Sequence, residues 1–219
     1  MSSRRLALFD CDGTLIDGQA SICEAMEAAF AAHGLVPPPR NDVRRAVGLS
    51  LPVAVRGLIP ECTPDVQDAV VESYKQAFRN ARAEGRLSQQ LVPGIRDVLE
   101  TLAGAGWALG VATGMSDRGL AHCLAENGVT DLFATLQTAD RHPSKPHPSM
   151  VQAALLETGT TAASAVMIGD TVFDMEMARS AGMRALGVDW GYHASNDLLA
   201  AGAELVAREA SDITEYLLS

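Results

Sequence analysis

Apolar residues recur every three or four positions from about residue 19 to residue 86, and no stretch in this range has the pattern of a strand. The spacing predicts four amphipathic helices, at residues 21–32, 42–47, 51–58 and 64–83. We expect Asn41 or Asp42 to cap the second of these helices and Gly48 to end it. The segment is therefore predicted to be all-α.

The rest of the chain alternates short apolar runs with helical patterns. The first run, residues 5–10, has no polar alternation, as expected for a strand that is buried on both faces. Further strands are predicted at residues 108–112, 132–136, 165–168, 184–188 and 204–206, with helices between them. This alternation is typical of a parallel sheet with right-handed crossovers. The predicted fold class is α/β: residues 1–18 and 87–219 form a Rossmann-like parallel sheet core, and residues 19–86 are inserted as an all-α cap domain.

Composition and charge narrow the possible functions of this 219-residue chain. Apolar residues make up 47% of it and charged residues 20%, which is ordinary for a globular protein. The formal net charge of -10, without any cluster of Lys or Arg, argues against nucleic acid as a partner. No apolar run approaches the roughly 18 residues that a membrane span needs, so no membrane association is expected.

The cysteines and the N-terminal residues bear on the cellular compartment. The four cysteines are scattered and include no C-x-x-C pair, so neither a zinc site nor a disulfide framework is predicted. The apolar run after Arg4 and Arg5 is too short for a signal peptide. A reducing, cytoplasmic location is therefore expected.

Two carboxylates, Asp10 and Asp12, follow the first predicted strand and are followed by Gly13. Residues at positions i and i+2 of an extended chain point to the same side. Two anions at the end of a buried strand are unfavourable unless a cation or a reaction requires them. An Asp-Gly hairpin turn is the alternative interpretation of the same residues.

Other polar residues follow the later strands, where the carboxyl ends of parallel strands usually form a site. Thr113 and Gly114 end the strand predicted at 108–112, and Asp170 ends the one at 165–168, with Asp174 one helical turn beyond it. Lys145 is one of only two lysines in a chain with fifteen arginines. A lysine kept in such a chain suggests a need for a compact ammonium group, although a surface lysine is the alternative.

Taken together, the motifs D-x-D-G-T at Asp10, the single Thr113 and Lys145, and I-G-D-x-x-x-D ending at Asp174 occur in a familiar order. With them the chain resembles the haloacid dehalogenase-like (HAD) phosphohydrolase superfamily, in the subclass with a helical cap, and is similar to phosphoglycolate phosphatase-like members. The resemblance covers nearly the whole chain and implies the HAD fold.

The resemblance also implies a role for each motif residue. Asp10 is the expected nucleophile that forms an aspartyl-phosphate, and Asp12 the expected acid that protonates the leaving oxygen and then the base that activates water. Thr113 and the N–H of Gly114 are expected to hold the phosphate, and Lys145 to balance the charge. A carboxylate nucleophile divides phosphoester hydrolysis into two easier steps.

The same resemblance implies a Mg²⁺ cofactor. Its expected ligands are the Asp10 and Asp170 carboxylates and the backbone carbonyl of Asp12, and Asp174 is expected to orient Lys145 or a metal-bound water. Mg²⁺ favours a few hard oxygen ligands together with water, and these residues can supply them. The expected reaction is hydrolysis of a small phosphomonoester, phosphoglycolate-like or a sugar phosphate.

Substrate contacts from the predicted cap are the least determined part of the interpretation. Arg44, Arg45, Arg56 and Tyr74 are candidates, with Arg45 chosen as a substrate-binding residue, and solvated surface is the alternative for each arginine. Gly18 and the segment near Gly85 are expected hinges.

The same fold also allows three alternatives to the phosphatase. A phosphotransferase of the β-phosphoglucomutase type has a His and an Arg where this chain has Ile22 and Leu51, which disfavours it. A pyrophosphatase of the same superfamily and a non-catalytic phosphate-binding module are the others, although none of the motif residues is missing. The expected partner is a small phosphorylated metabolite, and the chain is expected to be a monomer or a homodimer.

Overall fold

The computed structural model describes residues 4–219 and contains a six-stranded parallel sheet in the order β5-β4-β1-β6-β7-β8. The strands are β1 (Arg5–Phe9), β4 (Trp107–Thr113), β5 (Thr135–Thr138), β6 (Ala165–Gly169), β7 (Arg184–Val188) and β8 (Val206–Ala207). All five strand pairs in this sheet are parallel, which confirms the predicted α/β class.

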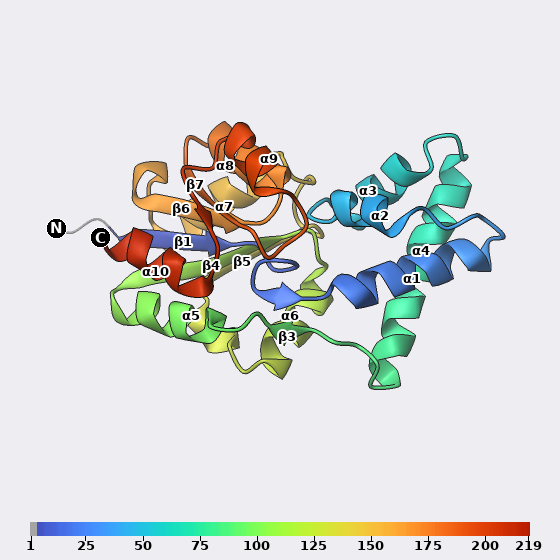
Figure 1. Ribbon diagram of the computed structural model, residues 1–219, viewed down its shortest axis with the longest axis horizontal. Coiled ribbons are helices and arrows are strands. Elements are labelled where there is room, and N and C mark those ends of the chain that lie inside the picture. Colours follow the sequence, from blue (N-terminus) through green and yellow to red (C-terminus); the bar gives the residue numbers. More distant parts are fainter. Residues whose placement is uncertain (1–3) are drawn as a thin grey trace.

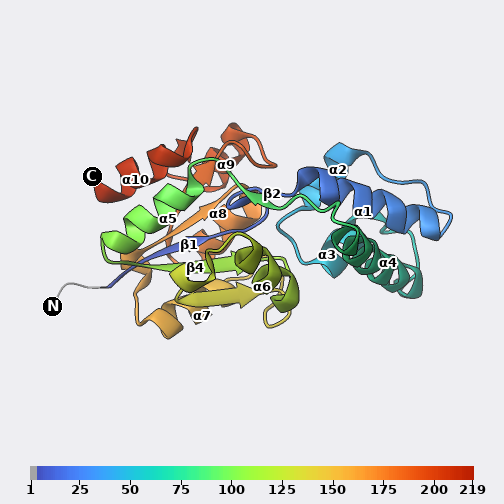
Figure 2. The same cartoon turned by 90° about the horizontal axis from the view of Figure 1, so that it is seen from below.

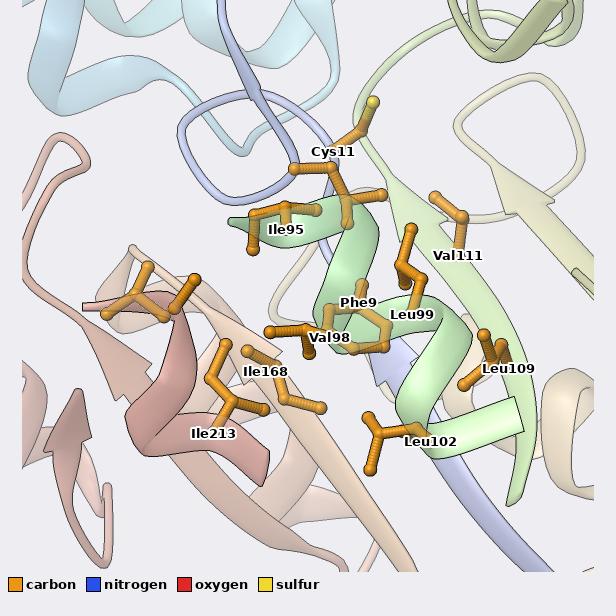
Figure 3. Close-up of a cluster of buried hydrophobic side chains, with 14 of the residues drawn as sticks. Phe9, Cys11, Ile95, Val98, Leu99, Leu102, Leu109, Val111, Ile168 and Ile213 are labelled. Atoms are coloured by element: carbon orange, nitrogen blue, oxygen red, sulfur yellow. The ribbon is translucent and has the colours of Figure 1, made fainter. Parts of the chain in front are cut away.

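Helices cover both faces of the sheet (Figure 1). They are α5 (Ile95–Gly104), α6 (Asp117–Glu126), α7 (Ser149–Thr158), α8 (Val172–Ser180), α9 (Ser195–Ala201) and α10 (Ala210–Leu218), with short 3₁₀ helices at Thr130–Leu132 and Ala162–Ser164. Side chains of β1 alternate between the two faces: Phe9 packs with α5 and α10 on one, and Leu8 packs with α7 and α8 on the other. Figure 3 shows the first of these clusters, with Phe9, Leu99 and Ile213 among its members. Residues 6–9 of β1 are therefore buried on both faces of the sheet, as their unbroken apolar run predicted.

The helices of residues 19–83 form a separate layer beside the carboxyl end of the sheet (Figure 2). They are α1 (Gln19–Ala32), α2 (Arg40–Ala46), α3 (Leu51–Leu58) and α4 (Pro64–Ala83). Phe30 of α1, Val55 of α3 and Val70 of α4 belong to a hydrophobic cluster that is distinct from the two clusters of the sheet. We call α1–α4 with their connecting loops the helical unit.

A two-stranded antiparallel ribbon lies where the chain crosses between the sheet and the helical unit. It pairs β2 (Ile16–Asp17) with β3 (Gln90–Leu91), in the register Ile16 with Leu91 and Asp17 with Gln90. The sequence did not predict this ribbon, because two residues are too few to show a period of two.

Other boundaries also differ from the sequence prediction, and one of them is the end of α2, which stops at Ala46 and not at Gly48. Helix α2 begins at Arg40 after Pro39, so Asn41 and Asp42 lie within its first turn and cap nothing. The strand predicted at 132–136 is β5, shifted to Thr135–Thr138, because residues 130–132 form a 3₁₀ turn. The strand predicted at 204–206 is β8, two residues long. Among residues 4–219, no helix is both long and apolar enough to cross a membrane.

Candidate active site

The middle of the sheet brings three of the predicted residues together. Asp10 directly follows β1, and its N–H donates a hydrogen bond to the carbonyl oxygen of Ile168 at 2.8 Å, which extends the pairing with β6. Thr113 ends β4 and Asp170 directly follows β6, the two strands that flank β1. The sequence positions of these residues and the parallel topology thus account for their meeting at one edge.

Lys145 lies in the loop between β5 and α7 and is only 1% exposed. Its Nζ lies 2.8 Å from Asp10 Oδ1 and 2.7 Å from Asp174 Oδ1. Burial lowers the pKa of Lys145, but the attraction of the two carboxylates outweighs burial and raises the pKa above its ordinary value. The surface alternative for Lys145 is therefore wrong, since its ammonium group is charged, buried and paired.

Asp174 is held in place by the first turn of α8. Its Oδ2 accepts hydrogen bonds from the N–H of Thr171 at 3.1 Å and from the hydroxyl of Thr171 at 2.7 Å, in a capping box. Because Oδ1 accepts from Lys145, both oxygens of Asp174 have partners. Asp174 therefore contacts Lys145, one of the two arrangements that the sequence left open.

Asp170 is fixed by two loops on either side of it. Its Oδ1 accepts a hydrogen bond from the hydroxyl of Thr14, and its Oδ2 accepts one from the N–H of Tyr192, both at 2.9 Å. A Cβ added at Gly13 or at Gly191 would collide with the Asp170 carboxylate, and Gly13 also has a φ of 85°. Glycine is thus required at both positions for the backbone to approach this carboxylate.

Negative charge exceeds positive charge in this cluster. Carboxylate oxygens of Asp10, Asp170 and Asp174 lie within 4.8 Å of one another, and Lys145 is the cation between them. Asp10 Oδ2 is buried and has no hydrogen-bond partner among residues 4–219. Burial raises the pKa of Asp10 from 3.8 to about 7 despite Lys145, and burial together with Asp10 and Asp174 raises that of Asp170 well above 3.8. An unpartnered carboxylate oxygen in such a cluster fits a hard divalent cation.

Asp12 lies apart from the carboxylate cluster. A Cβ added at Gly18 would be 3.2 Å from Asp12 Oδ1, which places this side chain beside the start of the helical unit. Burial raises the pKa of Asp12 to about 6, although Lys145 opposes the shift. A carboxylic acid with this pKa exchanges protons near neutral pH.

Thr113 and Gly114 form the next part of the edge. The Thr113 hydroxyl accepts a hydrogen bond from the N–H of Met115 at 3.2 Å, which leaves its own proton free to be donated. Gly114 lies against Leu49 of the helical unit, because an added Cβ would be 2.5 Å from the Leu49 carbonyl oxygen.

A cavity of about 480 Å³ lies between the sheet edge and the helical unit. Asp10, Asp12, Thr113 and Gly114 line it from the sheet, and Tyr74 lines it from α4. Arg44, Arg45 and Arg56 are exposed and do not line it. The structure thus gives no support to Arg45 as a substrate contact. Its carbonyl oxygen lies 3.2 Å from Nε2 of His193, and its side chain is exposed and does not line the cavity.

Arg82 and Gln89 also line the cavity, and neither belongs to a motif that could have indicated this from the sequence. Tyr192 is a further residue outside the motifs: it holds Asp170 through its backbone and packs against the helical unit's hydrophobic cluster.

The helical unit is closed onto the sheet. The N–H of Ser50 donates a hydrogen bond to Oγ of Ser144 at 2.9 Å, and Gly48 lies within contact distance of the Thr171 side chain. The cavity is therefore bounded by both parts of the chain at once.

Comparison with known proteins identifies the family of the chain. The family model described as haloacid dehalogenase-like hydrolase matches residues 7–188, and the chain belongs to this family. The probable phosphatase IndB of Dickeya dadantii is 33% identical over 211 residues, 95% of this chain and 91% of that protein. A phosphoglycolate phosphatase of Pseudomonas putida is 29% identical over 205 residues, 92% of this chain and 75% of that protein.

A solved structure of a haloacid dehalogenase-like hydrolase from Streptococcus pneumoniae covers 99% of both chains with a TM-score of 0.85 and 25% identity. These similarities confirm the predicted fold and the resemblance to phosphoglycolate phosphatase-like members. The chain is thus an enzyme of this hydrolase family, and its relatives are phosphatases by name.

Proposed function

We propose that the protein is a Mg²⁺-dependent phosphatase that hydrolyses a small phosphomonoester, phosphoglycolate-like or a sugar phosphate, through an aspartyl-phosphate intermediate. The observation that supports this best is the environment of Asp10. Its Oδ1 is paired with Lys145 at 2.8 Å, its Oδ2 has no hydrogen-bond partner in the described chain, and the residue lines the cavity. A carboxylate in this state suits attack on phosphorus in a bound ester.

The proposed reaction has two steps. An oxygen of Asp10 bonds to phosphorus while the bond from phosphorus to the leaving oxygen breaks, and Asp12 gives its proton to that oxygen. Asp12 then takes a proton from water, the water oxygen bonds to phosphorus, and inorganic phosphate leaves with the Asp10 carboxylate restored. The pKa of Asp12, raised to about 6 by burial, suits a group that must give and then take a proton.

Three groups are proposed to hold the phosphate. The Thr113 hydroxyl has its proton free, because its oxygen accepts from Met115, and the Gly114 N–H follows it in the chain. Lys145 remains charged and offsets the repulsion between Asp10 and an incoming phosphate dianion.

The Asp10 and Asp170 carboxylates and the Asp12 carbonyl are the proposed Mg²⁺ ligands. Hard oxygen donors and the unpartnered Asp10 Oδ2 fit this ion. Mg²⁺ bound there supplies positive charge that favours the approach of a carboxylate to a phosphate. Asp174 is proposed to orient Lys145.

Residues 19–86 are proposed to act as a cap that opens for substrate and closes over it, with hinges at Gly18 and near Gly85. Contacts between this segment and the sheet include the hydrogen bond of Ser50 with Ser144 and the packing of Tyr192 against the helical unit, and opening would have to break both. Closure would exclude water from Asp10 while the ester is bound.

Apolar residues in the cavity favour hydrolysis over a mutase reaction. Ile22 and Leu51, which stand where mutase-type members have His and Arg, both line the cavity. At these two positions the chain therefore lacks the imidazole and the guanidinium group that mutase-type members have there.

The test is phosphate release from phosphoglycolate, several sugar phosphates and pyrophosphate, with and without Mg²⁺. We expect release that requires Mg²⁺, favours a monoester and is absent from an Asp10→Asn preparation made in the same way. Release without Mg²⁺, release from the Asp10→Asn protein, or no release from any ester would contradict the proposal.

A further inference from the structure

We infer that Arg82 and Gln89 recognise the leaving group of the substrate and that they select a leaving group that carries a carboxylate. The inference rests on the proposed phosphatase function and adds the chemical class of its substrate, a phosphate ester of a hydroxy acid. Arg82 lies in the last turn of α4, and Gln89 lies in the segment that returns to the sheet just before β3.

The Arg82–Gln89 pair presents two hydrogen-bond donors without acceptors. Arg82 Nη2 donates to Gln89 Oε1 at 3.1 Å, which leaves the amide nitrogen of Gln89 as its free end, since the reverse orientation would set donor against donor. Arg82 Nε and Gln89 Nε2 are both buried and lack a partner within residues 4–219, and Gln89 is only 5% exposed. Buried donors of this kind are unfavourable until an acceptor arrives, and both side chains line the cavity.

The position of the pair matches the side on which the leaving group must lie. Asp17 pairs with Gln90 in the β2–β3 ribbon, and Gly18 and Gln89 are the residues that adjoin this last pair in the sequence. Gly18 is the residue against which the Asp12 carboxylate lies. The leaving oxygen must reach Asp12 to be protonated, so the rest of the leaving group extends toward the pair.

Hydrogen bonds from Asn127 hold the backbone at Gln89 in place. The side-chain amide of Asn127 donates to the Gln89 carbonyl oxygen at 2.8 Å, and its Oδ1 accepts from the N–H of Leu91 at 3.2 Å. Asn127 is the C-cap residue of α6 in the sheet part of the chain. Gln89 is therefore anchored beside the catalytic edge, and Arg82 reaches it from the helical unit.

Charge around the cavity also favours an anion. Lys75, Arg79 and Arg118 line the cavity together with Arg82, and Asp140 is the one acidic lining residue besides Asp10 and Asp12. This excess of cations stands out in a chain of net charge -10. A carboxylate offers two acceptor oxygens to the two free donors of the Arg82–Gln89 pair, whereas a neutral hydroxyl offers one.

The test compares two esters that differ in the carboxylate, 2-phosphoglycolate and ethyl phosphate, in the presence of Mg²⁺. Gln89→Glu keeps the acceptor for Arg82 and the size of the side chain but replaces its free donor with a negative oxygen. We expect kcat/KM for 2-phosphoglycolate to fall roughly 10- to 100-fold, and that for ethyl phosphate to change less than about twofold. Arg82→Gln is expected to act in the same direction. The matched controls, Gln90→Glu and Arg86→Gln, change exposed neighbours that do not line the cavity and should alter neither value.

An equal loss for both esters would show a structural role and overturn the inference, as would no loss for either. A binding measurement separates this failure from failure of the phosphatase proposal. Calorimetric titration with 3-phosphonopropionate and with propylphosphonate, which cannot be hydrolysed, tests for the carboxylate without turnover. A preference for 3-phosphonopropionate that Gln89→Glu abolishes supports the inference, and equal binding or no binding of the two compounds overturns it.

Discussion

The two walls of the cavity differ in how completely their polar groups are satisfied. Behind Asp10 on the sheet side, Lys145 contacts two carboxylates, Asp174 has partners on both oxygens, and Asp170 accepts one hydrogen bond on each. Asp10 Oδ2, an atom of a proposed Mg²⁺ ligand, is the unpartnered oxygen of this carboxylate cluster. On the helical side most lining residues are apolar, and the Arg82–Gln89 pair retains two unpaired donors. The sheet side is thus fixed before substrate arrives, and the helical side offers groups that only a ligand can satisfy.

The groups proposed to carry out the reaction are thus largely separate from the groups inferred to select the substrate. Groups that must be placed to a fraction of an ångström lie on rigid strand ends and the first turn of a helix. Of the two groups inferred to distinguish one leaving group from another, Arg82 lies on the helical unit, which is proposed to open, and Gln89 is held by Asn127 of the sheet part. Variants of the sheet side should therefore affect all substrates, and variants of the helical side should affect some.

The largest expected effect is that of Asp10→Asn, because it removes the proposed nucleophile. Turnover should fall by roughly 10⁴-fold or more for every ester, while the fold is retained, since Lys145 keeps its contact with Asp174. Stopped-flow phosphate release and a thermal unfolding curve measure the two halves of this prediction. Residual activity within about tenfold of the unmodified protein would remove Asp10 from the nucleophile role.

Asp12→Asn should lower turnover by roughly 10²- to 10⁴-fold, since it removes the proposed acid and base. The pKa of about 6 keeps roughly one Asp12 carboxyl in ten protonated at pH 7, and this share shrinks as the pH rises. The rate of the first step should therefore decline above about pH 6 for alkyl esters and less for p-nitrophenyl phosphate, whose leaving group needs no proton. A pH–rate profile for the two esters decides this, and identical profiles would argue against Asp12 as the acid.

More of the site residues on the sheet side than on the helical side could be predicted from the sequence, and the reason is physical. Asp10, Thr113 and Asp170 follow buried strands, and parallel topology alone then brings them to one edge. Lys145 was foreseen from its rarity and from the family resemblance, although its depth of burial was not.

The contact between Arg82 and Gln89 could not be predicted from the sequence. It depends on the length of α4 and on the β2–β3 ribbon, whose strands have only two residues each. The same uncertainty affected Arg45: a helical pattern tells which residues share a face but not where the helix lies against a neighbour. Helix α2 faces the sheet through its carbonyl at Arg45 and carries that side chain in solvent.

The separate hydrophobic cluster of the helical unit predicts that its stability can be changed without changing that of the sheet. Phe30→Ala, at a side chain only 1% exposed, should cost about 3–5 kcal/mol of local stability. Hydrogen exchange should then accelerate at the amides of α1 and α4 and remain unchanged in β1. The matched variant Leu99→Ala, in the sheet cluster, should accelerate exchange in β1. Equal acceleration in both parts for both variants would show that the two clusters unfold together.

The smallest expected effect concerns the uncompensated charge of the carboxylate cluster. Because burial raises the pKa of Asp10 from 3.8 to about 7, the folded metal-free chain binds more protons than the unfolded chain between these two values. Its contribution to stability is therefore most favourable below about pH 4 and is lost as the pH rises toward 7. Asp10→Asn carries no such charge, so its melting temperature should rise relative to the unmodified protein over this range.

Mg²⁺ at about 100 times its dissociation constant should stabilise the unmodified protein by about 2.7 kcal/mol and stabilise Asp10→Asn less, which reverses the order at pH 7. Thermal unfolding at several pH values, with EDTA or with Mg²⁺, measures both differences. A difference between the two proteins that is independent of pH and of Mg²⁺ would mean that Asp10 neither carries this charge nor binds the ion.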